Sequence, residues 1–219
     1  MSSESAEDIH IEVDLRAQWS GARDQGLRNA CLACATSDAH GHSHGLRDAL
    51  SAEFLYFHAA QRMPGSSGAL GLTFAAAGDA LAAEGQPLEQ EWPYQSVQPA
   101  PWVPPTVTAR WYGDLTMAAA ITGLHAALQS RRPIVLALRL TPEWLDPVAS
   151  RSRLKSSGTG FGCHAVLGVG LGEHSTAGPL VLVRNSWGER WGQGGYAWVE
   201  EGYFQDKLVA LADIRPRAP

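Results

Sequence analysis

The pattern of apolar residues divides the chain into a first part with helix-like runs and a second part with short, strand-like runs. In the first part, the runs are rich in alanine and other helix-compatible residues. We predict helices in four ranges: residues 29–39, 51–61, 73–83 and 117–129. Ser51 precedes the second of these helices, and Gly85 follows the third, as is typical of helix ends.

The later apolar runs are short, rich in Val, Ile, Leu and Tyr, and separated by glycine-rich turns, as β-strands are. Strands are predicted at residues 11–15, 134–140, 164–169, 180–183 and 196–199. Most helices therefore precede most strands, without the alternation of a parallel sheet, and the sequence predicts an α+β fold. Residues 93–105, rich in Pro and Trp, are predicted to be extended and to lie at the seam between two lobes.

The first predicted helix and the segment after it contain candidate chemistry. Asn29 is placed to cap the helix N-terminus, which would put Cys31 in the first turn. The following stretch HGHSHG, residues 40–45, has two glycines among polar residues and is expected to interrupt the helix. Its three histidines could bind a metal adventitiously, but a structural site needs four ligands with supporting contacts. We therefore predict no metal and no cofactor.

Composition and charge are those of an ordinary soluble globular protein. The chain has 219 residues, of which 45% are apolar and 18% charged, and this suits one domain of two lobes. A net charge of −5 argues against binding to nucleic acid or to an anionic membrane, and no apolar run is long enough to span a bilayer. The acidic N-terminus lacks the features of a secretory signal, and only three cysteines are present. A reducing, cytoplasmic location is expected, and export without a signal stays open as the alternative.

Three residues far apart in the sequence have the chemistry of a nucleophilic thiol with its base. A helix N-terminus favours the thiolate form, and Cys31 lies at such a predicted position. His164 opens the apolar run HAVLGVG, and Asn185 follows another strand, in the run VRNSWGERWGQGGY. Side chains at strand ends can face a cleft while the strands stay in the core. Cys31, His164 and Asn185 are therefore candidates for the nucleophile, the base and the group that orients the base.

The residues around these positions resemble the papain family of cysteine peptidases. The pair Gln25-Gly26 precedes Cys31 at the family's spacing, and His164 opens the family's His-Ala-Val run. The family's Asn-Ser-Trp-Gly, Trp-Gly and Gly-Tyr elements are matched without a gap by Asn185, Ser186, Trp187, Gly188, Trp191, Gly192, Gly195 and Tyr196. The resemblance covers roughly residues 14–209.

The resemblance implies a papain-like fold of two lobes with the active-site cleft between them. The mainly helical lobe would cover roughly residues 11–115, and an antiparallel, β-barrel-like lobe roughly residues 116–219. The whole chain would form a single peptidase domain, 1–219, that begins with a disordered lead of residues 1–10. The implied activity is that of a cysteine endopeptidase, which hydrolyses a peptide or protein substrate through an acyl-enzyme thioester.

The resemblance also implies a role for each matched residue. Cys31 would attack the scissile carbonyl, and His164 would take its proton and later protonate the leaving amine. Asn185 would accept a hydrogen bond from the His164 ring, and Trp187 would shield that bond from water. Gln25 would donate to the oxyanion beside the backbone N–H of Cys31. One such donor stabilises a transition state by ~3 kcal/mol.

Some positions depart from the family pattern. Arg28 replaces a cysteine that many secreted members use in a disulfide, and Leu32 replaces the usual tryptophan beside the nucleophile. Cys34 replaces an aromatic residue and, one helical turn from the nucleophile, is expected to face the core. Gly71 is followed by Leu72 where the family has a Gly-Gly pair that binds the substrate backbone, so the substrate subsites are expected to differ.

Other functions stay open at this stage. A thioester can pass to an amine instead of water, which would make the chain a transpeptidase or another amide-forming enzyme. The chain could also be an inactive papain-like binding module, or could require a regulatory partner protein. Cys31 and Cys34 form a CxxC pair, but a redox motif of this kind expects a βαβ setting that the pattern lacks. Cys163 is expected to point away from the cleft and to be inert, although a residue at a strand start can reach a cleft.

Overall fold

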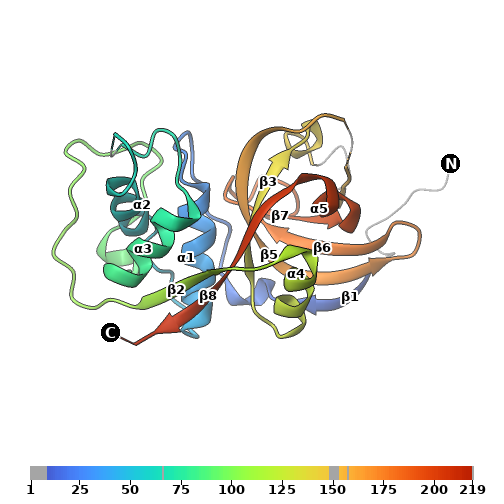
Figure 1. Cartoon of the computed structure of the whole chain (residues 1–219), viewed down its shortest axis with the longest axis horizontal. Coiled ribbons are helices and arrows are strands. Elements are labelled where there is room, and N and C mark those ends of the chain that lie inside the picture. Colours follow the sequence, from blue (N-terminus) through green and yellow to red (C-terminus); the bar gives the residue numbers. More distant parts are fainter. Residues whose placement is uncertain (1–8, 66, 148–152, 157, 219) are drawn as a thin grey trace.

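The protein has two lobes that lie side by side (Figure 1). The computed structural model describes four stretches: residues 9–65, 67–147, 153–156 and 158–218. Three helices make up one lobe: α1 (Cys31–Ser43), α2 (Ala52–Gln61) and α3 (Phe74–Ala83). Two further helices pack against the sheet of the other lobe: α4 (Ala120–Gln129) and α5 (Glu201–Lys207). This separation of helices from strands is the predicted α+β class.

The strands form one open, mixed sheet in the order β2-β8-β3-β5-β6-β7-β4, and β1 pairs with β5 beside this path. Their bounds are β1 (Ile9–Asp14), β2 (Tyr112–Met117), β3 (Ile134–Leu140), β4 (Arg153–Leu154), β5 (Phe161–His174), β6 (Gly178–Arg184), β7 (Tyr196–Glu200) and β8 (Leu208–Arg217). Among these strands, only β4 and β7 pair in parallel. The predicted lobe of mainly antiparallel strands is therefore present, but its sheet does not close into a barrel.

Strands β2 and β8 extend between the sheet lobe and the helical lobe, in opposite directions (Figure 1). They pair antiparallel, and β8 also pairs with β3 in the sheet lobe. The sequence predicted neither strand, and it placed Met117 at the start of a helix that in the structure begins at Ala120. Three of the six residues of β2 are exposed and its one buried residue is Gly113, so its sequence lacks the run of Val, Ile or Leu by which the other strands were predicted.

Helix α1 differs from the prediction at both ends. Its N-cap is Ala30, whose side chain makes no capping hydrogen bond, while the Asn29 amide donates to the Ala69 carbonyl at 2.6 Å. The predicted Asn29 cap is therefore wrong. The helix also continues through most of the HGHSHG stretch to Ser43, and only the C-cap His44 and Gly45, which has a φ of 67°, lie beyond its end. The predicted interruption at residue 40 is wrong as well.

Tertiary contacts explain why the helix tolerates this glycine-containing stretch. Each histidine in it contacts a group outside the helix: His40 Nδ1 with Gln86 Oε1 at 2.8 Å, His42 Nε2 with Arg131 O at 3.0 Å, and His44 Nε2 with Tyr112 O at 2.9 Å. Such contacts outweigh the helix propensity of about 1 kcal/mol that a glycine loses relative to alanine. Among the described residues, no three or more His, Cys, Asp or Glu side chains are grouped to bind a metal ion.

The Pro- and Trp-rich connection lies on the outer side of the helical lobe, away from the sheet (Figure 1). Its Tyr94 hydroxyl donates to the Gln25 carbonyl at 2.9 Å, and Trp102 Nε1 donates to Glu53 Oε1 at 2.6 Å. The prediction that residues 93–105 lie at the seam between the lobes is therefore wrong. The lobes meet instead where α1 packs against β5 and β8.

The start of the chain belongs to the sheet lobe. Residues 1–8 of the predicted lead lie outside the described residues, whereas Ile9 and His10 already form part of β1 and pair with β5. The N-terminal strand is therefore an exception to the predicted helical lobe of residues 11–115. In the part of the chain that the structure describes, no helix has the length and apolar character needed to cross a membrane.

Arg28 and Glu53 form a buried ion pair in the helical lobe. Both terminal nitrogens of Arg28 donate to the carboxylate, at 2.6 and 2.9 Å, and Glu53 is 0% exposed. The indole N–H of Trp102 donates to the same carboxylate, and Arg28 Nη1 also reaches the Gln95 carbonyl at 2.7 Å. Many secreted members of the family that the sequence resembles have a disulfide cysteine at this position. This chain has Arg28 instead, and its ion pair with Glu53 connects the loop before α1 to α2.

We predict that Arg28→Ala lowers the free energy of unfolding by about 3–5 kcal/mol, because the Glu53 carboxylate would stay buried without its cation. Urea denaturation measures the change. The control is Arg16→Ala, since the Arg16–Asp14 pair is partly exposed and should contribute less than about 1 kcal/mol. A loss for Arg28→Ala no larger than that of the control would contradict the importance of the buried pair.

Protonation of His40 should destabilise the fold in mild acid. His40 is fully buried, and burial lowers its pKa from 6.5 to about 4. Between these values the unfolded chain binds a proton that the folded chain does not, so stability falls as the pH is lowered, by at most about 1.4 kcal/mol per pH unit. In His40→Asn, whose amide N–H can replace Nδ1–H toward Gln86, urea denaturation between pH 7 and 4.5 should show a shallower dependence on pH. An unchanged dependence would contradict this account.

Candidate active site

Cys31 is the first residue of α1, and its thiol lies at the junction of the two lobes. Burial raises the pKa of this thiol, while the backbone N–H groups of Ala165 in β5, of Leu32 and of Cys31 itself oppose that rise. The N-cap residue Ala30 makes no side-chain hydrogen bond, so the first N–H groups of the helix remain available to a negative charge at this end. The lack of the predicted Asn29 cap therefore leaves the helix N-terminus free to favour the thiolate.

His164 and Asn185 lie on neighbouring strands, in β5 and directly after β6. The His164 Nε2 atom lies 2.6 Å from Asn185 Oδ1, and a carbonyl oxygen can only accept, so Nε2 carries the hydrogen. In the neutral ring, Nδ1 is then the nitrogen that can take a proton. Asn185 Oδ1 also accepts from the Ser186 backbone N–H at 2.8 Å, and the Asn185 N–H donates to the Gly195 carbonyl at 2.9 Å. The side-chain oxygen of Asn185 is thus held by a second hydrogen bond, and the backbone of Asn185 by its bond to Gly195.

Trp187 packs against the His164 ring and helps to bury the hydrogen bond between His164 and Asn185. The two ring centres are 4.6 Å apart, and His164 and Asn185 are only 5% and 2% exposed. Trp191 packs edge-on against Trp187 at 6.0 Å. Burial lowers the pKa of His164 to about 4, against an opposing effect of the hydrogen bond to Asn185. The low local polarity also strengthens the hydrogen bond between the ring and the amide.

Gln25 is held in one orientation by three hydrogen bonds. Its backbone N–H donates to the Ser186 carbonyl at 2.8 Å, and its Oε1 accepts from the Ser186 hydroxyl at 2.7 Å. Its Nε2 donates to the Arg28 carbonyl at 2.8 Å, which leaves a second N–H of the amide for another acceptor. The sequence indicated no role for Ser186 beyond the motif match, although its polar side chain next to Asn185 was a signal.

Cys31 and His164 line the same cavity of about 410 Å³, although they come from different lobes. The helical lobe contributes Asn29, Leu32, Leu70, Gly71, Leu72, Thr73 and Phe74 to its wall, and the sheet lobe contributes Ala137, Cys163, Ala165, Val209 and Ala210. Most of these side chains are apolar. Of the four predicted site residues, two therefore face the cavity, while Asn185 binds the ring of His164 and Gln25 is bound to Ser186.

The other two cysteines have different environments. Cys34 is buried in the core, as predicted, and burial raises its pKa. Cys163 is exposed and lines the same cavity as Cys31, so the expectation that it points away from the cleft is wrong. It precedes His164 near the beginning of β5, where Phe161 and Gly162 are exposed as well. All three cysteines are free thiols.

Comparison with solved structures shows the same fold in cysteine proteases. Xylellain, a cysteine protease from Xylella fastidiosa, superposes with a TM-score of 0.74 at 18% identity, over 100% of this chain and 95% of that one. The proform of the Amb a 11 cysteine protease, a ragweed pollen allergen, superposes with a TM-score of 0.71 at 21% identity, over 97% of this chain and 65% of that one.

Comparison of sequences assigns the family. A curated protein named "Probable cysteine protease RDL3", from Arabidopsis thaliana, is 41% identical over 59 residues, which are 26% of this chain and only 16% of that protein. Residues 11–210 match the family described as papain family cysteine protease. That match includes Cys31, His164, Asn185 and the cavity between the lobes, and the chain belongs to the papain family of cysteine proteases.

Proposed function

We propose that this chain is a cysteine endopeptidase that hydrolyses peptide bonds through an acyl-enzyme thioester. The observation that carries the proposal is the cavity that Cys31 and His164 both line, each from a different lobe. Because the hydrogen bond to Asn185 occupies Nε2, the ring's Nδ1 is left to exchange a proton with the thiol. A nucleophile, a base and a group that orients the base are the parts that acyl transfer requires.

In the proposed reaction, the Cys31 proton passes to His164 Nδ1 while Sγ attacks the scissile carbonyl carbon. The oxyanion accepts hydrogen bonds from the Cys31 backbone N–H and from the free N–H of Gln25 Nε2. Collapse of this intermediate breaks the C–N bond, and His164 gives its proton to the leaving amine. A water molecule, deprotonated by His164, then attacks the thioester; the C–S bond breaks, the acid is released, and the proton returns from His164 to the Cys31 sulfur. The hydrogen bond to Asn185 keeps the ring in the orientation that both steps need.

Burial opposes each of the two charges when they are considered separately, because it raises the pKa of Cys31 and lowers that of His164 to about 4. Proton transfer between them creates both charges at once, and their attraction is strong in a site of low polarity. The free helix N-terminus favours the thiolate, and the Asn185 carbonyl oxygen favours the imidazolium. The active pair therefore depends on how closely the two lobes bring these groups together.

The cavity wall suits a peptide with an apolar side chain near the bond that is cut. Leu70, Leu72 and Phe74 line it from the helical lobe, and Val209 lines it from the sheet lobe. We propose an extended peptide or protein segment as the substrate, with an apolar residue at the second position before the cut. Leu72 follows Gly71 in the wall, where the family has a second glycine that binds the substrate backbone, so this substrate preference is expected to differ from that of the family.

We predict that Cys31→Ala abolishes hydrolysis of a fluorogenic peptide with an apolar residue at that position. Stability should change little, because alanine is well tolerated in the first turn of a helix. The matched control is Cys34→Ala, one turn along the same helix, which should keep most of the activity because Cys34 is buried in the core. A Cys31→Ala protein that retains more than a few per cent of wild-type activity would refute the assignment.

A further inference from the structure

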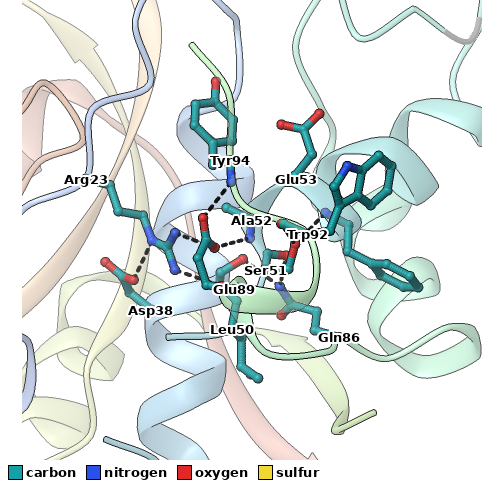
Figure 2. A network of polar contacts seen from close by, with 12 residues as sticks. Arg23, Asp38, Leu50, Ser51, Ala52, Glu53, Gln86, Glu89, Trp92 and Tyr94 are labelled. Atoms are coloured by element: carbon teal, nitrogen blue, oxygen red, sulfur yellow. Dashed lines mark hydrogen bonds and ion pairs between the residues drawn. The ribbon is translucent and has the colours of Figure 1, made fainter. Parts of the chain in front are cut away.

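A buried carboxylate joins two arginines at the junction of the lobes. Asp38, in α1, accepts from Arg23 Nε at 2.8 Å on one oxygen and from Arg184 Nε at 2.7 Å on the other. Figure 2 shows the contact with Arg23 and its continuation to Glu89 and Leu50. Asp38 and Arg184 are 7% and 4% exposed, so water contributes little to their solvation.

We infer that Asp38 is a positioning residue for the proposed active site and acts through Arg23 and Arg184. This inference rests on the proposed function, since it concerns the same reacting groups. A single carboxylate would set the relative positions of three chain segments, each of which carries a residue of the site. Asp38 itself would not contact the substrate.

Asp38, Arg23 and Arg184 form what we call the ion cluster, and their positions in the sequence connect it to the site. Asp38 lies about two helical turns after Cys31 on α1, so it moves with the nucleophile as part of one rigid helix. Arg184 directly precedes Asn185 at the end of β6, and Arg23 lies two residues before Gln25. The ion pairs to Asp38 therefore fix the nucleophile's helix relative to the strand end that orients His164.

Further hydrogen bonds hold both guanidinium groups rigidly. Arg184 also donates to the Tyr196 hydroxyl at 2.8 Å and to the Gly21 carbonyl. Arg23 also donates to Glu89 at 2.9 Å and to the Leu50 carbonyl at 2.8 Å. All three nitrogens of each arginine are thus bound, and neither planar group can turn without breaking a bond.

The cluster lies directly against the amide that binds His164. A small cavity of about 10 Å³, close to the size of one water molecule, is lined by Asp38, Arg184, Asn185 and Ser186 together with four smaller or apolar residues. The Asn185 Nδ2 atom is buried and has no hydrogen-bond partner among the described residues. A shift of the cluster would therefore reach Asn185 directly.

Asp38 carries a charge in this setting. Burial alone would raise its pKa, but the nearby positive charges of Arg23 and Arg184 outweigh this and lower the pKa below its ordinary value. Asp38→Asn keeps the size of the side chain and removes the charge, so two buried cations would share a neutral partner. We expect Arg184 to shift and to move Asn185 with it.

The test compares Asp38→Asn with Asp213→Asn. Asp213 is a matched control because it also accepts from two arginines, Arg132 at 3.3 Å and Arg215 at 2.8 Å, but is not part of the wall of the active-site cavity. Three quantities are measured on folded protein: kcat and KM for the fluorogenic peptide, and the pH profile of Cys31 alkylation by iodoacetamide. Urea denaturation at the assay pH establishes that each variant is folded.

For Asp38→Asn we expect kcat to fall about 10- to 100-fold with KM within about two-fold of wild type, because reacting groups are displaced while the apolar wall is unchanged. The pH profile of alkylation should also shift. Asp213→Asn should keep the wild-type kcat and profile even where it loses stability. A folded Asp38→Asn protein with the kinetics and profile of the control would overturn the inference.

Arg184→Lys is a second variant for the case in which Asp38→Asn does not fold. Lysine keeps the positive charge but cannot make the three directed contacts of Arg184, so the same fall in kcat and the same shift in the profile are expected. Wild-type values for this variant would also overturn the inference. The alkylation profile requires no peptide hydrolysis, so it separates a failure of this inference from a failure of the proposed endopeptidase activity.

Discussion

Buried charges join the two lobes beside the proposed active site. Cys31 belongs to the helical lobe and His164 to the sheet lobe, so their separation is set by how α1 packs against β5. Apolar packing alone would let such surfaces slide, whereas a buried carboxylate between two arginines has a fixed geometry. Losing one partner would leave a charge buried without compensation, which makes the arrangement hard to change. Asp38 therefore provides the directional contact at this junction.

Burial has opposite effects on the parts of the site. It keeps water from the hydrogen bond between His164 and Asn185 and so fixes the ring, but it also disfavours a charge on His164 or Cys31 alone. A site of this kind favours the transfer of a proton within the pair over the gain or loss of a proton to solvent. Such a transfer requires that the two lobes keep a fixed relative position, and the ion pairs of Asp38 are the contacts proposed to hold it.

The sequence predicted the features that depend on local pattern and on motif. It identified the helices that begin at Ala52 and Phe74, the strand Ile134–Leu140, and the hydrogen bond between His164 and Asn185 that the resemblance implied. It failed where distant contacts decide the structure. The histidines that stabilise the end of α1 bind groups far away in the sequence, and strand β8 pairs with β2 and β3, which are also far away in the sequence. A charged Asp38 in an apolar helix was a visible signal, but its two arginines were not identifiable from spacing.

The most direct test of the account is intact-mass spectrometry after brief exposure to a peptidyl epoxide near neutral pH. The account predicts one adduct, mapped by peptide digestion to Cys31 and not to Cys163, although both thiols line the cavity. His164→Ala should remove it, because the thiol would lose its base. An adduct on Cys163, or one on Cys31 that persists in His164→Ala, would contradict an assembled Cys31–His164 pair, as would the absence of any adduct in a folded protein.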